Sequence, residues 1–288
     1  MDPLKVQRMR RYKFKAIETP YWKPGDDYLR IIIRYLNGIV QDHDFVVLSE
    51  KAISIATGNI IDESMVSSGF MAHLIAKYWM RIIWGFFLGR LSNLKKETIQ
   101  HLRRYPILEG NAHKQVALTN TGFLRALMYG SEGGIDGSNL PYSFVSLPLI
   151  NPKAASEKIR KYVQFHLKKK VTIMIVDTDN TYSVGGFHFT HRVNPIPGIY
   201  SIGGFLAFVI GRFMKFKKGA TPVAISGNDL SLENALEIAD ISNRIRGFGA
   251  GKNVWEMAER FGVSIGGVTW EMLETLSHKP IVIIRICD

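Results

Sequence analysis

The 288-residue chain has a single cysteine, no long uncharged apolar run and fewer acids than bases. That cysteine, Cys287, excludes an intrachain disulfide framework and a cage of cysteine ligands for a metal. Such a composition is typical of a reducing compartment, so a cytoplasmic protein is expected. The first fifteen residues contain no apolar core stretch, which predicts no secretory signal peptide.

No segment offers the ~20 clean apolar residues that a membrane-spanning helix needs. Residues 70–91 are rich in aromatic side chains but include Lys77, Arg81 and Arg90. Residues 196–211 are uncharged, shorter than a span and interrupted by glycine and proline. We therefore expect no membrane span. The first stretch is predicted to be a helix with a thick apolar face, or one that binds a partner or membrane surface, and the second a buried strand and turn.

Several catalytic signatures are also missing. The glycine-rich residues 247–251 are not followed by Gly-Lys-Ser/Thr, so the P-loop pattern fails. His188 and His191 have no cysteine or carboxylate nearby in the sequence, which argues against zinc. No Ser-His-Asp or Cys-His arrangement indicates a nucleophile.

Positive charge is what the chain has in excess, with 37 Lys and Arg against 25 Asp and Glu and a net charge of +12. This balance predicts attraction to polyanions such as RNA, a nucleotide or a membrane surface. Two basic segments are candidates for RNA binding, and ordinary solvated surface is the alternative for both. Their candidate contact residues are Arg8, Arg10 and Arg11 in an N-terminal arm, and Lys168, Lys169 and Lys170 at the end of a predicted helix.

Strand-like and helix-like segments interleave along the chain, which predicts a mixed α/β or α+β fold. We expect a basic arm over residues 1–16, a main domain over 17–250 that contains a helical segment at 64–104, and C-terminal helices and a strand over 251–288 packed on the same domain. Ser231 is a predicted helix N-cap. The pattern predicts strands at 45–49, 171–176, 222–226 and 280–286, strand character at 116–128, and helices at 28–36, 153–170 and 231–246.

Two turn-rich segments each present an acid. Asp136 lies in a glycine-rich loop over residues 133–139, and Asp177 with Thr178 follows the apolar run 171–176. A carboxylate with a hydroxyl is a hard-oxygen pairing that suits Mg²⁺ or Mn²⁺, and α/β proteins place ligand groups at strand ends. The alternatives are an Asx turn at Asp136 and a helix N-cap at Asp177.

The ordered set of motifs resembles the coenzyme F420-0:L-glutamate ligase (γ-glutamyl ligase) family of archaea and some bacteria. The resemblance spans roughly residues 17–250, and its strongest parts are Gly-Ile-Asp-Gly-Ser-Asn at 134–139 and Asp-Thr at 177–178. It implies a two-lobed α/β fold, a homodimer, and the use of GTP (or ATP) with Mg²⁺ or Mn²⁺ to activate a carboxylate as an acyl phosphate. By position it implies that Asp136, Asp177 and Thr178 bind the metal and that Asn139 contacts the nucleotide.

The chain departs from the family pattern at three places. Ile55 stands where the family has a nucleotide-binding lysine, so Lys51, expected on a strand or turn, is predicted to contact phosphate instead. Asn180 follows Asp-Thr where the family has Gly-Arg, and residues 201–208 contain no acid. Our hypothesis is a divergent paralogue that forms amide bonds with metal and nucleotide. The alternative is a non-catalytic RNA- or ribosome-associated protein on a retired ligase scaffold.

Overall fold

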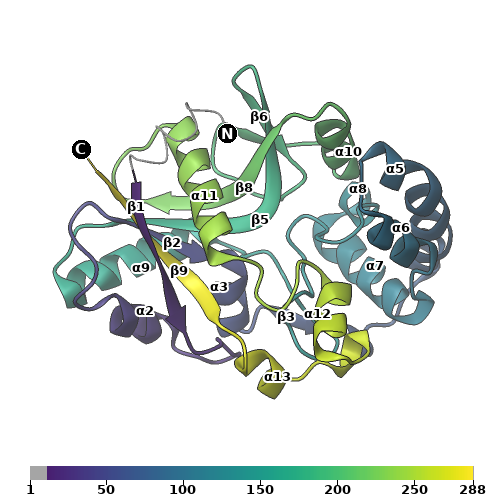
Figure 1. The fold of residues 1–288 in the computed structure, drawn as a ribbon, viewed down its shortest axis with the longest axis horizontal. Helices are drawn as coiled ribbons and strands as arrows, with labels where there is room; N and C mark the ends of the chain where they lie inside the picture. Colours follow the sequence, from purple (N-terminus) through teal and green to yellow (C-terminus); the bar gives the residue numbers. More distant parts are fainter. Residues whose placement is uncertain (1–11, 288) are drawn as a thin grey trace.

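A seven-stranded mixed sheet organises the fold in the computed structural model, which describes residues 12–287 (Figure 1). The strand order is β1-β9-β2-β5-β6-β7, and β8 also pairs with β5. The strands are β1 (Tyr12–Thr19), β2 (Phe45–Ser49), β5 (Thr172–Val184), β6 (Phe187–Thr190), β7 (Ile199–Ser201), β8 (Lys217–Ser226) and β9 (His278–Ile286). The predicted mixed α/β class is therefore confirmed.

Strand β5 is the centre of the sheet and is much longer than predicted. Its first half pairs in parallel with β2, its second half pairs antiparallel with β6, and β8 runs antiparallel to both halves. The predicted strand end at Val176 is wrong, since the ladder with β8 resumes at Asn180 after an irregularity that begins at Asp177. The N-cap alternative for Asp177 is wrong for the same reason. Both acids of the Asp-Thr-Asp run thus lie mid-strand, where the backbone departs from regular pairing.

Alternation along the strands divides the sheet into two buried faces. Val46 and Leu48 pack with α2 and α9, whereas Phe45 and Val47 pack with α11 on the opposite face. Ser231 caps α11 as predicted, accepting a hydrogen bond from the backbone N–H of Asn234 at 3.3 Å. The helices next to the sheet are α2 (Tyr28–Leu36), α3 (Glu50–Ala56), α9 (Pro152–Leu167) and α11 (Leu232–Arg246).

A mostly helical lobe lies beside the sheet, on the right of Figure 1. Its elements are η1 (Glu63–Met65), α4 (Phe70–Leu74), η2 (Ile75–Leu88), α5 (Gly89–Leu91), α6 (Lys96–Arg103), α7 (Ile107–Thr121), α8 (Phe123–Ala126) and α10 (Phe205–Phe213). This confirms the predicted helical segment at 64–104. No helix within residues 12–287 is long and apolar enough to cross a membrane.

Two predictions for this lobe are wrong. Residues 116–121 and 123–126 are helical where strand character was expected, and Val116, Ala117 and Ala126 are buried in the core of the lobe. Residues 196–211 contain only the short β7 before helix α10 begins. An uncharged apolar stretch fits a buried helix as well as a buried strand, so periodicity alone did not distinguish them.

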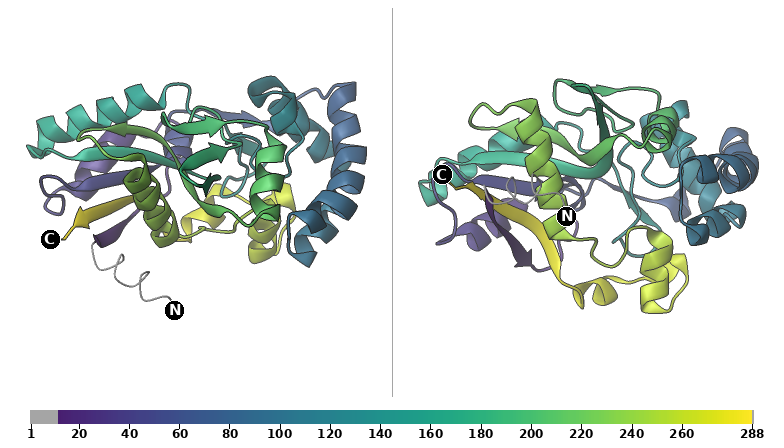
Figure 2. Two further views of the ribbon diagram at one scale, coloured as in Figure 1. Left: turned by 90° about the horizontal axis from the view of Figure 1, so that it is seen from above. Right: turned by 45° about the horizontal axis from the view of Figure 1, so that its top comes forward.

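A third group of elements closes the space between sheet and lobe. It comprises α12 (Val254–Phe261), η3 (Ile265–Gly267), α13 (Trp270–Glu274) and the small sheet of β3 (Ile60–Asp62) and β4 (Phe144–Ser146). Trp255 of α12 stacks on His101 of the helical lobe, with ring centroids 5.0 Å apart and an interplanar angle of 4°. In the left view of Figure 2, the yellow C-terminal helices lie between the sheet and the helical lobe.

Candidate functional site

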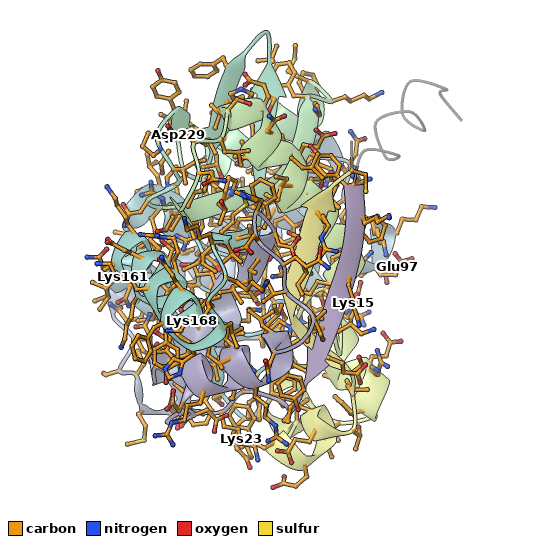
Figure 3. The ribbon with its side chains drawn as sticks, turned by 90° about the vertical axis from the view of Figure 1, so that its left-hand side faces the viewer. Lys15, Lys23, Glu97, Lys161, Lys168 and Asp229 are labelled. Carbon is orange, nitrogen blue, oxygen red and sulfur yellow. The ribbon has the colours of Figure 1, made fainter. Side chains whose placement is uncertain are left out.

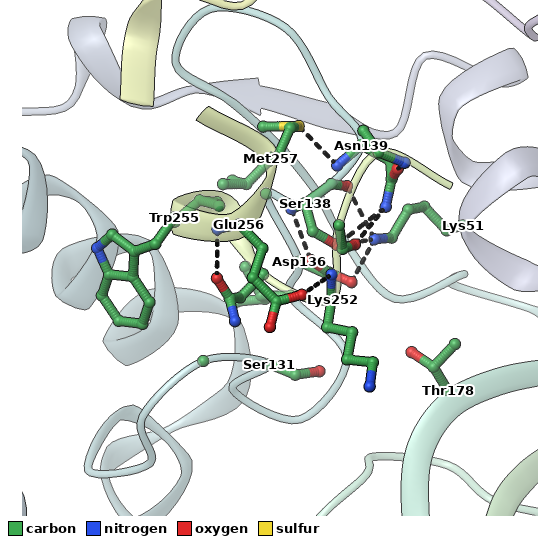
Figure 4. Close-up of a pocket in the computed structure, with 18 of the residues that line it drawn as sticks. Lys51, Ser131, Asp136, Ser138, Asn139, Thr178, Lys252, Trp255, Glu256 and Met257 are labelled. Atoms are coloured by element: carbon green, nitrogen blue, oxygen red, sulfur yellow. Dashed lines mark hydrogen bonds and ion pairs between the residues drawn. The ribbon is translucent and has the colours of Figure 1, made fainter. Parts of the chain in front are cut away.

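A cavity of about 1050 Å³ lies where the sheet, the helical lobe and the C-terminal helices meet. Its lining includes all five predicted metal and nucleotide residues: Lys51, Asp136, Asn139, Asp177 and Thr178. Figure 4 shows Lys51 directed at Asp136 and Ser138, with Thr178 on another wall. The structure therefore brings the predicted residues together, and their roles as ligands remain predictions.

Lys51 and Asp136 form an ion pair at the cavity wall. Lys51 lies in the first turn of α3, not on a strand or turn, and the Ser49 side chain caps that helix. Its ammonium pairs with Asp136 Oδ2 and donates to both the carbonyl and the hydroxyl oxygen of Ser138 at 3.0 Å. The backbone N–H of Ser138 donates to Asp136 Oδ1 at 2.7 Å, so the Asx turn is formed as well. Lys51 and Asp136 side chains are 20% and 21% exposed, which leaves both accessible to a ligand.

Asp177 belongs to a buried chain of alternating charges. Arg192, only 1% exposed, places Nε 2.5 Å from Asp177 Oδ2 and pairs through Nη2 with Glu50. Burial raises the pKa of Asp177 above its ordinary value, Arg192 opposes that rise, and the charge of Glu50 adds to it. Gly134 is required beside this arginine, because its φ is +107° and a Cβ there would lie 2.5 Å from Arg192 Cζ.

A second buried acid, Asp179, lies two residues further along β5. Its carboxylate accepts a hydrogen bond from the Ser131 hydroxyl and lies 3.3 Å from His191 Nε2. Burial, and then the neighbouring charge of Asp177, raises the pKa of Asp179. Asp179 Oδ1 is thus engaged by Ser131, and the imidazole of His191 lies beside Asp179 Oδ2. The cavity wall thus holds two carboxylates whose charged forms are disfavoured in the absence of an added cation.

Asn139 holds the loop at residues 247–251. Its amide nitrogen donates to the carbonyl oxygens of Phe248 and Gly251 at 3.2 and 3.1 Å, and its amide oxygen accepts from the N–H of Ala250 at 2.5 Å. Both polar ends of the side chain are therefore engaged with this loop. A direct contact between Asn139 and a nucleotide stays a prediction.

The donor chemistry of the wall suits a hard divalent cation. Asp136, Asp177 and Thr178 line the cavity and offer oxygen ligands, the donor atoms that such a cation prefers. Within residues 12–287, no group of three or more His, Cys, Asp or Glu side chains is arranged to hold a metal.

A buried cluster on the helical-lobe side was missed by the sequence analysis. His113 Nδ1 lies 2.6 Å from Glu63 Oε1, and its Nε2 lies 2.8 Å from Glu132 Oε2. Glu132 also pairs with the fully buried Lys114. Burial alone would lower the pKa of His113, but Glu132 and Glu63 outweigh it and raise the pKa to about 10. The cluster ties the segment just before Asp136 to helix α7.

Other site residues missed at first had weak local signals. Glu50 is adjacent to Lys51 and could have been included with its neighbour, whereas Asp179 stood with Asp177 at the end of the apolar run 171–176. Arg192 had no such signal, because it is brought to Glu50 and Asp177 only by the pairing of β5 with β6 and the chain that follows β6.

The basic segments lie away from the cavity or outside the described residues. Arg8, Arg10 and Arg11 fall outside residues 12–287. Lys168 ends α9 with its Nζ 5.1 Å from the ring centre of Phe165, and Lys169 Nζ lies 3.6 Å from Asp42. Lys170 follows them, and Figure 3 shows Lys168 on the face turned away from the helical lobe. RNA binding by either segment stays a prediction.

The mixed sheet, the helical lobe and the ordered Gly-Ile-Asp and Asp-Thr motifs around one cavity define a γ-glutamyl-ligase-like protein. Residues 16–188 match the family F420-0:Gamma-glutamyl ligase, and the chain belongs to that family. The resemblance found in the motifs is thereby confirmed.

Two relatives from Methanocaldococcus jannaschii (strain ATCC 43067 / DSM 2661 / JAL-1 / JCM 10045 / NBRC 100440) are similar to the chain. Uncharacterized protein MJ1361 is 37% identical over 290 residues, which cover 96% of this chain and 97% of that protein. Coenzyme F420:L-glutamate ligase is 24% identical over 175 residues, which cover 60% of this chain and 62% of that enzyme. The chain is thus far more similar to the uncharacterized protein than to the ligase.

Proposed function

We propose that this protein is a divergent γ-glutamyl-ligase-like enzyme that uses a nucleoside triphosphate, GTP or ATP, and Mg²⁺ or Mn²⁺ to form an amide bond. The observation that carries the proposal is the convergence of Lys51, Asp136 and Asp177 on one cavity, within the segment that matches the family. A lysine beside two carboxylates is the combination that phosphoryl transfer from a metal-bound nucleotide requires.

The proposed reaction has two steps. A substrate carboxylate oxygen attacks the γ-phosphorus, the bond to the β-phosphate oxygen breaks, and an acyl phosphate and nucleoside diphosphate form. The amine of an amino acid then attacks the acyl carbon, inorganic phosphate leaves with the bonding electron pair, and the nitrogen loses a proton. Little covalent chemistry falls to the protein, so its contribution is positioning and charge neutralisation.

Each residue has a defined part in this proposal. Asp136, Asp177 and Thr178 would hold the divalent cation, which neutralises phosphate charge when bound. Lys51 would turn from Asp136 to the phosphate oxygens, a movement that its partial exposure permits. Arg192 fixes the carboxylate of Asp177 from the buried side. Asn139 acts by holding the loop at residues 247–251 in place.

Calorimetric titration with GTP and ATP, each with Mg²⁺ or Mn²⁺, tests the proposal. We expect wild-type protein to bind nucleotide with metal, and Asp136→Asn and Asp177→Asn to weaken binding by at least about tenfold, because each removes a charged ligand. Asp229→Asn, in an exposed loop outside the cavity, is the matched control and should bind as wild type. Absence of nucleotide binding by wild-type protein with both metals would contradict the proposal.

An RNA- or ribosome-associated role is the second candidate, favoured by the net charge of +12 and the exposed basic end of α9. It predicts RNA binding that weakens steeply as salt increases. Co-sedimentation with ribosomes at low salt is the measurement, and no co-sedimentation there would exclude this role.

A further inference from the structure

Arg246, at the end of helix α11, is a cation in the cavity wall without a carboxylate partner. Among residues 12–287 its one recorded contact is a 3.0 Å hydrogen bond from Nη2 to Asn243 Oδ1, and no acid lies within ion-pair distance. Burial lowers its pKa to about 10, partly offset by the more distant charge of Asp177. The side chain is therefore still charged at neutral pH. The Arg246 side chain is partly exposed at the cavity wall, and a partly buried charge without a counter-ion is a favourable site for an added anion.

The nearest ionisable neighbours do not supply that anion. Asp177 is already bound to Arg192 on its buried side. Burial lowers the pKa of His278 to about 4, and the charge of Arg246 adds to this effect, so His278 is neutral at neutral pH. Its ring is held against Tyr21 at a centroid distance of 4.4 Å. Arg246 thus faces the cavity among groups that leave its charge uncompensated.

The loop that follows Arg246 adds hydrogen-bond donors. Gly247 and Gly249 have φ values of +75° and +58°, a backbone path that favours glycine. Asn139 fixes this path by binding the loop at Phe248, Ala250 and Gly251. The backbone N–H groups of Phe248 and Gly249 have no acceptor among the described residues, and both residues line the cavity. Successive free N–H groups beside a guanidinium are a favourable environment for an anion.

We infer that Arg246, with the N–H groups of Phe248 and Gly249, forms a subsite for an anionic oxygen group, a carboxylate or phosphate, of the ligand that occupies the cavity. The choice of ligand class rests on the proposed ligase-like function, whose nucleotide carries phosphate and whose acid substrate carries a carboxylate. The subsite lies beyond residue 188, outside the segment that matches the family. Through this part of the cavity, the chain can select an acid substrate different from that of the matched family.

The test measures anion binding directly, without metal or nucleotide. Wild-type protein, Arg246→Gln, Arg246→Lys and the control Arg244→Gln are titrated calorimetrically with inorganic phosphate and, separately, with glutarate. Arg244 is on the same helix, is 54% exposed and pairs with Asp240, so its replacement leaves the cavity unchanged. Circular dichroism establishes that each variant is folded.

We expect Arg246→Gln to weaken binding of at least one probe on the order of tenfold to a hundredfold, the range for charge-assisted hydrogen bonds. Arg246→Lys should retain part of the affinity, and Arg244→Gln all of it. Loss confined to phosphate assigns the subsite to the nucleotide, and loss confined to glutarate assigns it to a substrate carboxylate.

Equal binding of both probes by wild type and Arg246→Gln would overturn the inference, as would no binding of either probe to wild type. The two proposals can fail separately. If Arg246→Gln weakens anion binding but wild-type protein binds no nucleotide with metal, this inference holds and the proposed function fails.

Discussion

At the scale of single residues, the cavity wall around Asp177 depends on a buried chain of paired opposite charges. Arg192 is bound by Glu50 and Asp177, and its Nη1 also donates to the carbonyl oxygen of Gly133 at 2.9 Å. A chain of this kind holds the Asp177 carboxylate in one orientation at the wall. Removing Arg192 would leave the carboxylates of Glu50 and Asp177 buried without an opposite charge.

We therefore predict that Arg192→Met lowers the free energy of unfolding by about 3–5 kcal/mol, the cost typical of breaking a buried pair. Urea unfolding followed by circular dichroism measures it. Arg244→Met is the control, since it removes an exposed pair worth less than ~1 kcal/mol. An Arg192→Met variant as stable as this control would show that the buried chain does not hold the site.

The His113 cluster predicts a pH dependence of stability. Glu132 and Glu63 outweigh burial and raise the pKa of His113 to about 10, so its contribution is complete below the unfolded value near 6.5 and is lost as pH rises towards 10. Between pH 6.5 and 9.5, wild-type protein should lose stability relative to His113→Gln. Lys114, whose pKa is lowered by burial, has the opposite slope but is present in both proteins. The measurement is the denaturant midpoint of each protein across this pH range. A constant difference between the two midpoints would contradict the prediction.

At the scale of elements, the loop at residues 247–251 links α11 to α12. Arg260 of α12 donates one hydrogen bond to the Gly249 carbonyl oxygen at 3.0 Å, and a larger set comes from one side chain outside the loop. Asn139, itself in a left-handed conformation with φ of +56°, makes three hydrogen bonds to it. From the sequence, this glycine-rich segment was interpreted as a flexible turn between helices, with backbone amides directed at an anion as the alternative. The contact with Asn139 changes this loop into a fixed part of the cavity wall.

Asn139→Ala should free this loop while leaving the sheet intact. We expect faster amide hydrogen exchange confined to residues 247–251 and the start of α12, because three hydrogen bonds are lost and the backbone is otherwise exposed. Asn228→Ala, in an exposed loop outside the cavity, is the control. Unchanged exchange in the 247–251 loop would mean that other contacts hold it.

At the scale of the whole molecule, exposed apolar side chains gather on β6, β7 and α10. Phe187 and Tyr200 stack with centroids 5.1 Å apart, although they are 44% and 55% exposed. Leu206, Ile210 and Phe213 of α10 are also exposed. Large exposed apolar patches commonly mark interfaces, so this surface is where we place the predicted homodimer contact.

We predict that Phe187→Ser combined with Tyr200→Ser converts a dimer to a monomer, because the stacked pair would be central to the contact. Light scattering after size-exclusion chromatography gives the mass. Phe165→Ser on α9, 68% exposed and on another face, should leave the mass unchanged. Wild-type protein that elutes as a monomer at all concentrations would contradict the dimer.

The sequence by itself determined the mixed α/β class, the main helices and strands, and the acids and lysine of the cavity. These follow from local properties: alternation in the strands, spacing in the helices, and the Gly-Ile-Asp and Asp-Thr motifs at 134–136 and 177–178. The helices within 116–128 and 196–211 were not predicted, because a buried helix and a buried strand can have the same sequence pattern of apolar residues.

Only the tertiary structure decided which charges meet. It joined Arg192 to Glu50, 142 positions away, and also to Asp177, and it left Arg246 without an acid. Pairing of this kind depends on how strands align and helices pack, and neither the type of a residue nor its neighbours in sequence carries that information. The sequence therefore supplied the chemical groups of the cavity, and the packing of the sheet against the helical lobe determined which are neutralised and which remain free for a ligand.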